Sequence, residues 1–166
     1  MAFSASRRLA RDGWGAAESE RVYGAGAERR WGSGENYRAH FVFAGHADPA
    51  SGMLVNLTAV KQALASVVDS RYDHRFLNLD TPPFDRLPPT PEHLAAQLLA
   101  EGRAACAALP VPLVACHLAE SDRTAAIAWA DGTVEREHAI SFSAARRTFS
   151  PHLTDRENAD FFGRAA

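Results

Sequence analysis

The period of the hydrophobic pattern changes from two to about 3.6 between residues 36–45 and the segment that starts at Leu57, and this change limits the possible folds most strongly. Residues 36–45 alternate large apolar or aromatic side chains with others and end at a glycine, as a half-buried strand does. From Leu57 the apolar residues follow helical spacing, with Thr58 as N-cap and an end near Ser70. The pattern therefore predicts a strand, a turn and a helix.

A second helix is predicted after a proline-rich loop. Residues 71–93 carry five prolines, which makes this stretch irregular. Thr90 is placed to cap the helix, Pro91 to occupy its first turn and Glu92 to put a carboxylate near the positive end of the helix dipole. We expect this helix to reach about Ala108.

Two strand-type runs follow, at residues 111–119 and 124–130, with a hairpin-like connection at 120–123. An earlier strand is expected near the N-terminus, followed by a long irregular insert. The order strand, insert, strand, helix, loop, helix, strand, strand predicts an α+β fold, with two helices on one face of a four-stranded antiparallel sheet.

The composition indicates an ordinary globular chain. It has 166 residues, 46% of them hydrophobic and 23% charged, and a formal net charge of -2, which are average values that call for no nucleic-acid or membrane partner. No apolar run approaches the roughly 20 residues of a spanning helix, and the first residues lack the apolar stretch of a secretion signal. We therefore expect a cytoplasmic location, in which Cys106 and Cys116 are free, buried thiols.

The C-terminus repeats the N-terminus. When residues 3–27 are placed beside residues 142–166, eight of 25 positions are identical, at a spacing of 139 residues. The simplest account is a cut-short tandem duplication; an unrelated strand of similar composition is the alternative. We therefore predict a domain over residues 1–136, a partial second copy over 137–166, and an extra strand over 139–149 that pairs with a sheet edge of its own or a neighbouring chain.

Several strings resemble the 6-pyruvoyl tetrahydropterin synthases and the related 6-carboxytetrahydropterin synthases. They are FSASRRL, GSGENY, DPASGMLVNLTAVK, YDHRFLNLD, PTPEHLA and LAES, spread over nearly all of residues 3–130, and the DPASGMLVNL segment is the most specific. The resemblance implies a T-fold and subunits that assemble as trimers or hexamers, with pockets at the subunit boundaries. It implies the reaction less strongly, since fold and function separate easily.

The family holds a zinc ion with three histidines, and none of them is present in this chain. Arg7, Ser33 and Glu35 stand at the three positions, and Arg146 stands at the first one in the repeat. A guanidinium does not ligate a cation, and one hydroxyl with one carboxylate is a poor zinc site. We therefore expect no metal and no other cofactor, and we expect Arg7 and Glu35 to form an ion pair in the space that the metal left.

Other residues that the resemblance makes functional are partly retained. The family's cysteine is missing, since Gly26 or Ala27 occupies its place. Asp73 and His74 match an aspartate-histidine pair that relays protons, with the carboxylate fixing the imidazole tautomer. Without the resemblance, such a dipeptide in a proline-rich loop would be interpreted as two exposed surface residues without a function.

Three more residues match the pterin pocket of the family. Glu120 matches the glutamate that accepts hydrogen bonds from the 2-amino and ring N–H groups of a pterin, a planar edge that calls for a carboxylate. Thr90 and Glu92 match further lining residues. Helix capping explains Thr90 and Glu92 as well, and a polar hairpin tip explains Glu120. The other histidines lack metal-type spacing and are read as structural or exposed: His40, His46, His93, His117, His138 and His152.

Two classes of function follow from these observations. In the first, a zinc-free member of the family binds a pterin or purine-like heterocycle through Glu120 and acts on it by acid-base chemistry at Asp73 and His74. In the second, the protein is a non-catalytic binding or scaffold member. A third reading assigns the chemistry to a second copy.

Overall fold

The computed structural model describes all residues except 12, 28, 30 and 164–166. This part of the chain forms six strands and five helices in the order β1 (Ala2–Arg7), α1 (Ala16–Tyr23), β2 (Ser33–Phe43), α2 (Leu57–Arg71), β3 (Arg75–Phe76), α3 (Leu77–Asp80), α4 (Pro91–Ala105), β4 (Leu113–Ala119), β5 (Thr124–Trp129), β6 (Val134–His138) and α5 (Asp155–Phe162).

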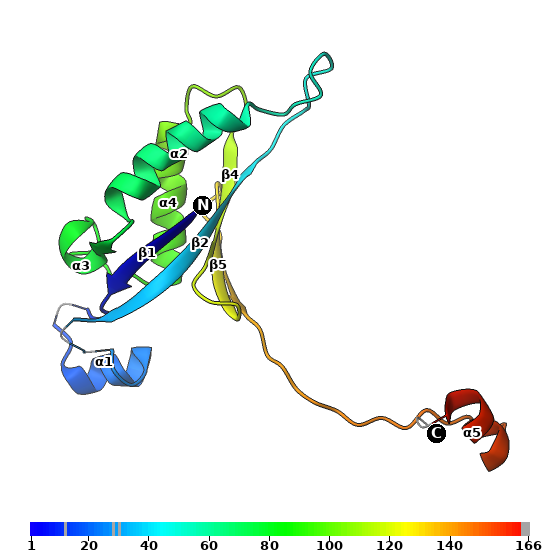
Figure 1. Cartoon of the computed structure of the whole chain (residues 1–166). Coiled ribbons are helices and arrows are strands. Elements are labelled where there is room, and N and C mark those ends of the chain that lie inside the picture. The colour runs from blue at the N-terminus through cyan, green and yellow to red at the C-terminus, as the bar shows by residue number, and fades with distance from the viewer. Residues whose placement is uncertain (12, 28, 30, 164–166) are drawn as a thin grey trace.

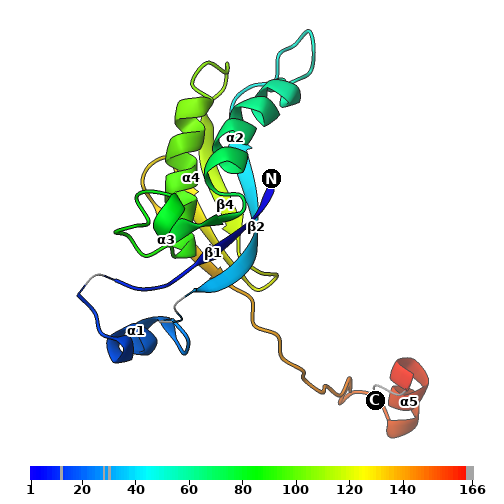
Figure 2. The same cartoon turned by 60° about the vertical axis from the view of Figure 1, so that its left-hand side comes forward.

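The strands form one sheet in the order β3-β1-β2-β4-β5-β6. All neighbours are antiparallel except β3, which runs parallel to β1. Helices α2, α3 and α4 lie on one side of the sheet and leave the other side open (Figures 1 and 2). The α+β prediction with helices on one face is therefore confirmed, and the short strands β3 and β6 extend the predicted four-stranded sheet.

The core lies between the covered face of the sheet and helices α2 and α4. Alternate residues of β1 point into it, and Phe3 stacks on Tyr37 of β2 with ring centroids 5.0 Å apart. Phe3, Ala5 and Arg7 are all buried. Because side chains alternate along a strand, the pattern that buries Phe3 and Ala5 also delivers the cationic Arg7 to the covered face.

The helix boundaries agree in part with those predicted from the sequence. Thr90 and Pro91 begin α4 as predicted, with the Thr90 side chain accepting from the His93 N–H. The N-cap of α2 is Asn56 and not Thr58, because the Asn56 side chain accepts from the amides of residues 58 and 59. Helix α1 lies in the insert that was predicted to be irregular. It buries only Ser19 and has no side-chain cap, so the capping signal that marks the start of a helix in a sequence is missing.

The C-terminal strand lies earlier than predicted. It is β6, and the prediction of a strand over residues 139–149 is wrong for the single chain, which leaves this segment without a strand partner. The segment is extended and mostly exposed, and it runs away from the sheet toward α5 (Figures 1 and 2). Thr154 and Glu157 form a capping box at the start of α5. No helix in the described part of the chain is long and apolar enough to span a membrane.

Candidate functional site

A buried ion pair joins the end of β1 to the end of β4. Nη2 of Arg7 contacts Oε1 of Glu120, and Nη1 donates to the Pro89 carbonyl oxygen at 2.6 Å. Arg7 is 5% exposed, and the side chain of Glu120 is 13% exposed. Glu120 is held there because its N–H donates to the Thr124 carbonyl across the β4–β5 turn. The pair is desolvated, so its two charges interact more strongly than they would at the surface.

A second guanidinium links this pair to α4. Nη2 of Arg136 lies 3.9 Å from Oε2 of Glu120, and Nη1 lies 3.2 Å from Oε1 of Glu92. Thr90 caps α4 directly after Pro89. Of the three residues predicted to line a pterin pocket, Glu120 contacts both Arg7 and Arg136, Glu92 contacts Arg136, and Thr90 follows Pro89, which accepts from Arg7. We call this group the Arg7–Glu120 cluster: Arg7, Pro89, Thr90, Glu92, Glu120 and Arg136.

The cluster is buried at Arg7 and more exposed at Arg136 and Glu92. Burial lowers the pKa of Arg7, while Tyr37 and Glu35 act in the opposite direction, and an arginine remains charged under such conditions. Burial also raises the pKa of Tyr37 to about 12. Within the described residues, neither Nε of Arg7 nor Oη of Tyr37 has a hydrogen-bond partner. The predicted ion pair between Arg7 and Glu35 is wrong, because Glu120 takes the guanidinium.

The three positions of the family's zinc ligands do meet at one cavity. Arg7, Ser33 and Glu35 line a space of about 250 Å³ together with Gly26 and Ala27, where the family has its cysteine. The register of β1 and β2 places Arg7 opposite Ser33, which explains why these distant positions converge. The cavity therefore lies where the resemblance places a metal site, and Ser33 and Glu35 are its only two oxygen-donor side chains among the three positions.

Zinc does not fit this donor set. The Arg7 guanidinium is positively charged and can only donate hydrogen bonds, so it cannot ligate a metal. One hydroxyl and one carboxylate remain as ligands. In the described parts of the chain, no group of three or more His, Cys, Asp or Glu side chains has the geometry to hold a metal ion. The two cysteines cannot replace the missing thiol, because both are buried. Burial raises the pKa of Cys116 to about 12 and also raises that of Cys106.

The Asp73–His74 pair forms at the other edge of β1. Nδ1 of His74 lies 2.8 Å from Oδ2 of Asp73, and the second carboxylate oxygen accepts from the Ser4 N–H at 2.9 Å. That backbone bond, followed by the bond to His74, lowers the pKa of Asp73. His74 has a positive φ of 56° and donates its own N–H to the Ser4 carbonyl. The imidazole is thereby oriented, and its side chain is 82% exposed.

The single chain does not bring the two groups into one pocket. His74 lines an open groove with Ser4, Asn36 and Glu35, and none of Glu120, Thr90 or Glu92 lines that groove. Sequence reasoning found most of the polar residues but missed Arg136, which β6 carries to the covered face. The alternation in residues 134–138 was the available signal, since it places Arg136 opposite in direction to Glu135 and Glu137.

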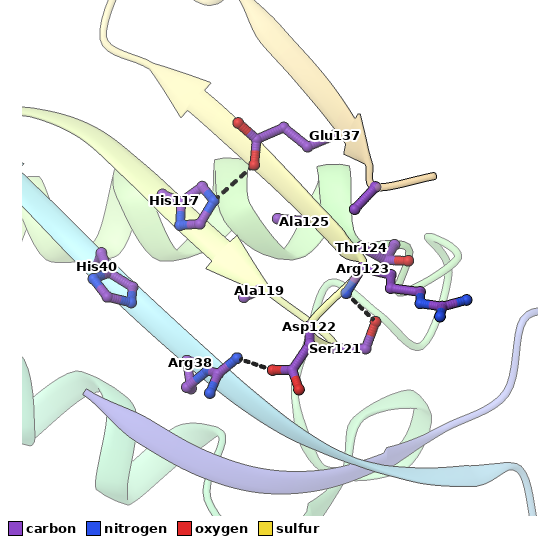
Figure 3. A pocket seen from close by; sticks show the side chains of 11 residues that line it. Arg38, His40, His117, Ala119, Ser121, Asp122, Arg123, Thr124, Ala125 and Glu137 are labelled. Carbon is purple, nitrogen blue, oxygen red and sulfur yellow. Dashed lines mark hydrogen bonds and ion pairs between the residues drawn. The ribbon is translucent and has the colours of Figure 1, made fainter. Parts of the chain in front are cut away.

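A third hollow, of about 420 Å³, lies on the open face of the sheet (Figure 3). His40 and His117 face each other across β2 and β4, with ring centroids 5.6 Å apart, and Nε2 of His117 lies 3.0 Å from Glu137. Arg38 pairs with Asp122 at its rim, at 2.6 Å. The strand register creates this hollow, so the sequence alone did not reveal it.

A mostly antiparallel sheet with helices on one face, and a polar cluster where β1, β4 and β6 meet the start of α4, place this chain in the T-fold class. Residues 1–131 match the family model for 6-pyruvoyl tetrahydropterin synthase. The chain therefore belongs to the 6-pyruvoyl tetrahydropterin synthase family.

Similar proteins support this assignment. The 6-pyruvoyl tetrahydrobiopterin synthase of Poecilia reticulata is 34% identical over 98 residues, which are 59% of this chain and 66% of that protein. The enzymes of that name from Drosophila melanogaster and Homo sapiens are 34% and 31% identical over 96 and 98 residues, which are 58% and 59% of this chain. These matches span 56% and 67% of the respective relatives' lengths. The structure of the Caenorhabditis elegans 6-pyruvoyl tetrahydropterin synthase is 23% identical, with a TM-score of 0.66 over 84% of this chain and 91% of that one.

Proposed function

We propose that this chain is a non-catalytic member of the 6-pyruvoyl tetrahydropterin synthase family, which keeps the fold as a scaffold and does not carry out zinc-dependent pterin synthesis. The observation that carries the proposal is the buried Arg7–Glu120 ion pair. The carboxylate expected to anchor a pterin already holds a planar guanidinium.

The competition between Arg7 and a ligand follows from their similar chemistry. A pterin presents two N–H donors on a planar N–C–N edge, and the Arg7 guanidinium, which is also planar, already contacts Oε1 of Glu120 through Nη2. A bound heterocycle loses translational and rotational freedom, whereas Arg7 is already part of the chain. Displacing Arg7 would also leave a guanidinium without its partner in a buried place, at a cost of about 3–5 kcal/mol. Glu120 is therefore expected to keep its contact with Arg7 and not to bind the heterocycle.

The metal positions support the same conclusion. The resemblance assigns to zinc the polarisation of the substrate, a contribution of roughly several kcal/mol. Arg7, Ser33 and Glu35 supply no such Lewis acid, and no thiol stands in the Gly26–Ala27 stretch of the same cavity. Zinc-dependent pterin synthesis is therefore expected to be absent.

A second candidate function is the binding of a pterin or purine-like heterocycle, with acid-base chemistry at His74 and Asp73. The observation that favours it is the intact pair, in which an oriented and exposed imidazole stands beside an ionised carboxylate. In this case the protein would be a trimer or hexamer in which His74 of one subunit reaches the Arg7–Glu120 cluster of the next.

A ligand titration separates the two candidates. Pterin, neopterin and guanine are added while the fluorescence of Trp14, Trp31 and Trp129 is recorded. We expect no binding by the wild type and a gain of binding by Arg7→Ala, which frees Glu120. Arg38→Ala, which removes an exposed arginine from an ion pair, is the matched control and is expected to behave like the wild type. Arg7→Lys keeps a cation without the planar edge and serves if Arg7→Ala does not fold.

Two results would overturn the scaffold proposal. One is saturable binding by the wild type that Glu120→Ala abolishes, which would establish the second candidate. The other is one equivalent of tightly held zinc in the purified protein, measured by elemental analysis, because it would show that Arg7, Ser33 and Glu35 had been misjudged as a donor set.

A further inference from the structure

A fourth hollow lies between the chain that leaves β1 and helix α3. It has a volume of about 570 Å³, and three segments line it: the chain between β1 and α1, Trp31 before β2, and the chain around α3. In Figures 1 and 2 the chain after β1 passes beneath α3 before it reaches α1. No residue of this lining belongs to the Arg7–Glu120 cluster or to the cavity at the predicted metal positions. We call this space the Trp14–Trp31 groove; its polar and aromatic lining includes Arg8, Arg11, Trp14, Trp31, Asn78 and Arg86.

Asn78 holds the floor of the groove in place. Its side-chain oxygen accepts from the Arg8 N–H at 2.7 Å, and its side-chain nitrogen donates to the Arg8 carbonyl oxygen at 3.0 Å. The same nitrogen lies 3.4 Å from the carbonyl oxygen of Phe84, whose ring is buried in the core. One amide thus joins the end of β1 to α3 and to the core. A floor that is already ordered loses little conformational freedom when a ligand binds.

The described lining of the groove carries more positive than negative charge. Arg8, Arg11 and Arg86 contribute three guanidiniums, and Asp85, which lies 3.5 Å from Nε of Arg86, contributes the one carboxylate. Neither Arg8 nor Arg11 forms an ion pair within the described residues. Nε of Arg8 is buried and has no hydrogen-bond partner there, although buried donors are normally paired. Uncompensated positive charge with a free donor favours an anionic ligand.

Two indole rings line the same groove. The Arg11 guanidinium lies over the Trp14 ring, with Cζ 5.3 Å from the ring centroid, and Trp14 packs beside Tyr23 with centroids 5.9 Å apart. Trp14 therefore supports the position of the Arg11 charge through a cation–π contact. Trp31 is 70% exposed, so it offers a ring surface on which a planar heterocycle can stack.

We propose that the Trp14–Trp31 groove binds a nucleoside monophosphate, whose phosphate contacts Arg8 and Arg11 and whose base stacks on Trp31. A phosphate group accepts hydrogen bonds from guanidinium groups in the geometry that arginine provides. A neutral nucleoside makes only the stacking contact, and inorganic phosphate makes only the ionic one. A ligand that carries both groups therefore fits this lining best.

The charge of the chain favours a single nucleotide over a nucleic-acid strand. Proteins that bind single strands without sequence preference follow the backbone with an extended positively charged groove. This chain has a formal net charge of -2, and the guanidiniums of the groove are confined to the two segments beside α3. The positive charge is thus local, as a small anionic ligand requires.

Calorimetric titration with adenosine monophosphate tests the groove, because the heat of binding can be measured even when a tryptophan is replaced. We expect saturable binding by the wild type. Adenosine and inorganic phosphate are each expected to bind at least about tenfold more weakly, since each lacks one of the two contacts. Equal affinity for inorganic phosphate would mean that the groove takes an anion and no base, and would overturn the proposal. The absence of binding would overturn it as well.

Two pairs of variants test the contacts. Arg11→Gln is expected to weaken binding of adenosine monophosphate at least about tenfold, whereas Arg103→Gln removes an exposed arginine of α4 outside the groove and should bind like the wild type. Trp31→Leu is expected to weaken binding by a similar factor, and Trp129→Leu on β5 is its control. Equal losses within the first pair would make net charge responsible, and equal losses within the second would exclude stacking; either result refutes the proposal.

Two further titrations distinguish this groove from other sites. Glu120→Gln is expected to bind adenosine monophosphate like the wild type, because Glu120 does not line the groove. A loss of binding in this variant would place the nucleotide at the Arg7–Glu120 cluster and overturn the inference. A long oligoadenylate that binds far more tightly than the monophosphate would identify a nucleic-acid surface and would also overturn it. The scaffold proposal concerns pterin binding at Glu120, so either proposal can fail without the other.

Discussion

Residues 3–8 and residues 142–147 are almost the same string in two different environments. The first, most of it in β1, is buried between β2 and β3 against α2 and α4, and the second is an exposed extended segment without a partner. The difference cannot come from intrinsic propensity, because five of six residues are identical. It comes from hydrogen-bond partners: β2 and β3 supply them for the first string, and the single chain supplies none for the second.

The helices that follow the two strings behave alike, whereas the strings themselves do not. Helices α1 and α5 have equal lengths, and both form although neither packs a large apolar face. A helix satisfies its main-chain groups internally, whereas a strand depends on a neighbour. The two similar segments therefore each form a helix, but only the first also forms a strand.

The largest difference in the free energy of unfolding is expected between Phe3→Ala and Phe142→Ala. Phe3 stacks on Tyr37 in the core, and truncating such a buried ring costs about 3–5 kcal/mol through lost burial and a cavity. Phe142 is solvent-exposed in the single chain, so its loss is expected to cost less than about 0.5 kcal/mol. Urea denaturation, followed by tryptophan fluorescence at a chain concentration where the wild type is monomeric, gives both values. Equal losses would mean that residues 142–147 belong to the folded core.

A slightly smaller difference in the free energy of unfolding is expected between Arg7→Ala and Arg146→Ala. Breaking a buried ion pair by removing one partner costs about 3–5 kcal/mol, and we expect the lower end because Arg136 remains 3.9 Å from Glu120. Arg146 is exposed, so its loss is expected to change the free energy of unfolding by less than about 0.5 kcal/mol. The double variant Arg7→Ala with Glu120→Gln should recover part of the loss, since no uncompensated charge stays buried. A failure to recover would assign the cost to lost packing of the arginine side chain.

Local patterns made much of the fold predictable. The change of period before Leu57 and the Thr90–Pro91 signal located the two helices of the covered face, because capping and amphipathic spacing are properties of neighbouring residues. Helix α1 was missed because it exposes nearly all of its surface. The strand over residues 139–149 was wrongly expected because sequence records the capacity to form a strand and not the presence of a neighbour.

The candidate site was predictable in its residues but not in its contacts. The resemblance pointed to Arg7, Glu35 and Glu120, yet it paired Arg7 with Glu35. Glu35 lies opposite Ala5 in the strand register, two positions from Arg7, and Glu120 reaches the guanidinium from the end of β4. That choice depends on how β4 and α4 pack, which no local pattern encodes. Arg136 is a different case, because the alternation in residues 134–138 indicated the face on which it lies but not its contact with Glu120.

The smallest effect on stability is expected from the hydrogen bond that distinguishes Ser4 from its counterpart Ser143. The Ser4 N–H donates to Asp73, and this bond holds the pKa of Asp73 below its usual range, whereas Ser143 has no such carboxylate nearby in the described chain. A carboxyl group whose pKa is lower in the folded state stabilises the fold above its unfolded pKa of about 4. That contribution disappears as the pH falls through the folded-state pKa.

Acid titration of Asp73→Asn tests this bond. We expect the variant to be less stable than the wild type near neutral pH, and the two free energies of unfolding to converge as the pH falls below about 4. Asp131→Asn is the matched control, because the Thr133 N–H lowers the pKa of Asp131 in the same way but far from β1. Only Asp73→Asn should also increase amide exchange at Ser4. If both variants leave that amide equally protected, the Asp73 carboxylate does not help to hold β1, and the contrast between the two strings depends on the pairing with β2 and β3 alone.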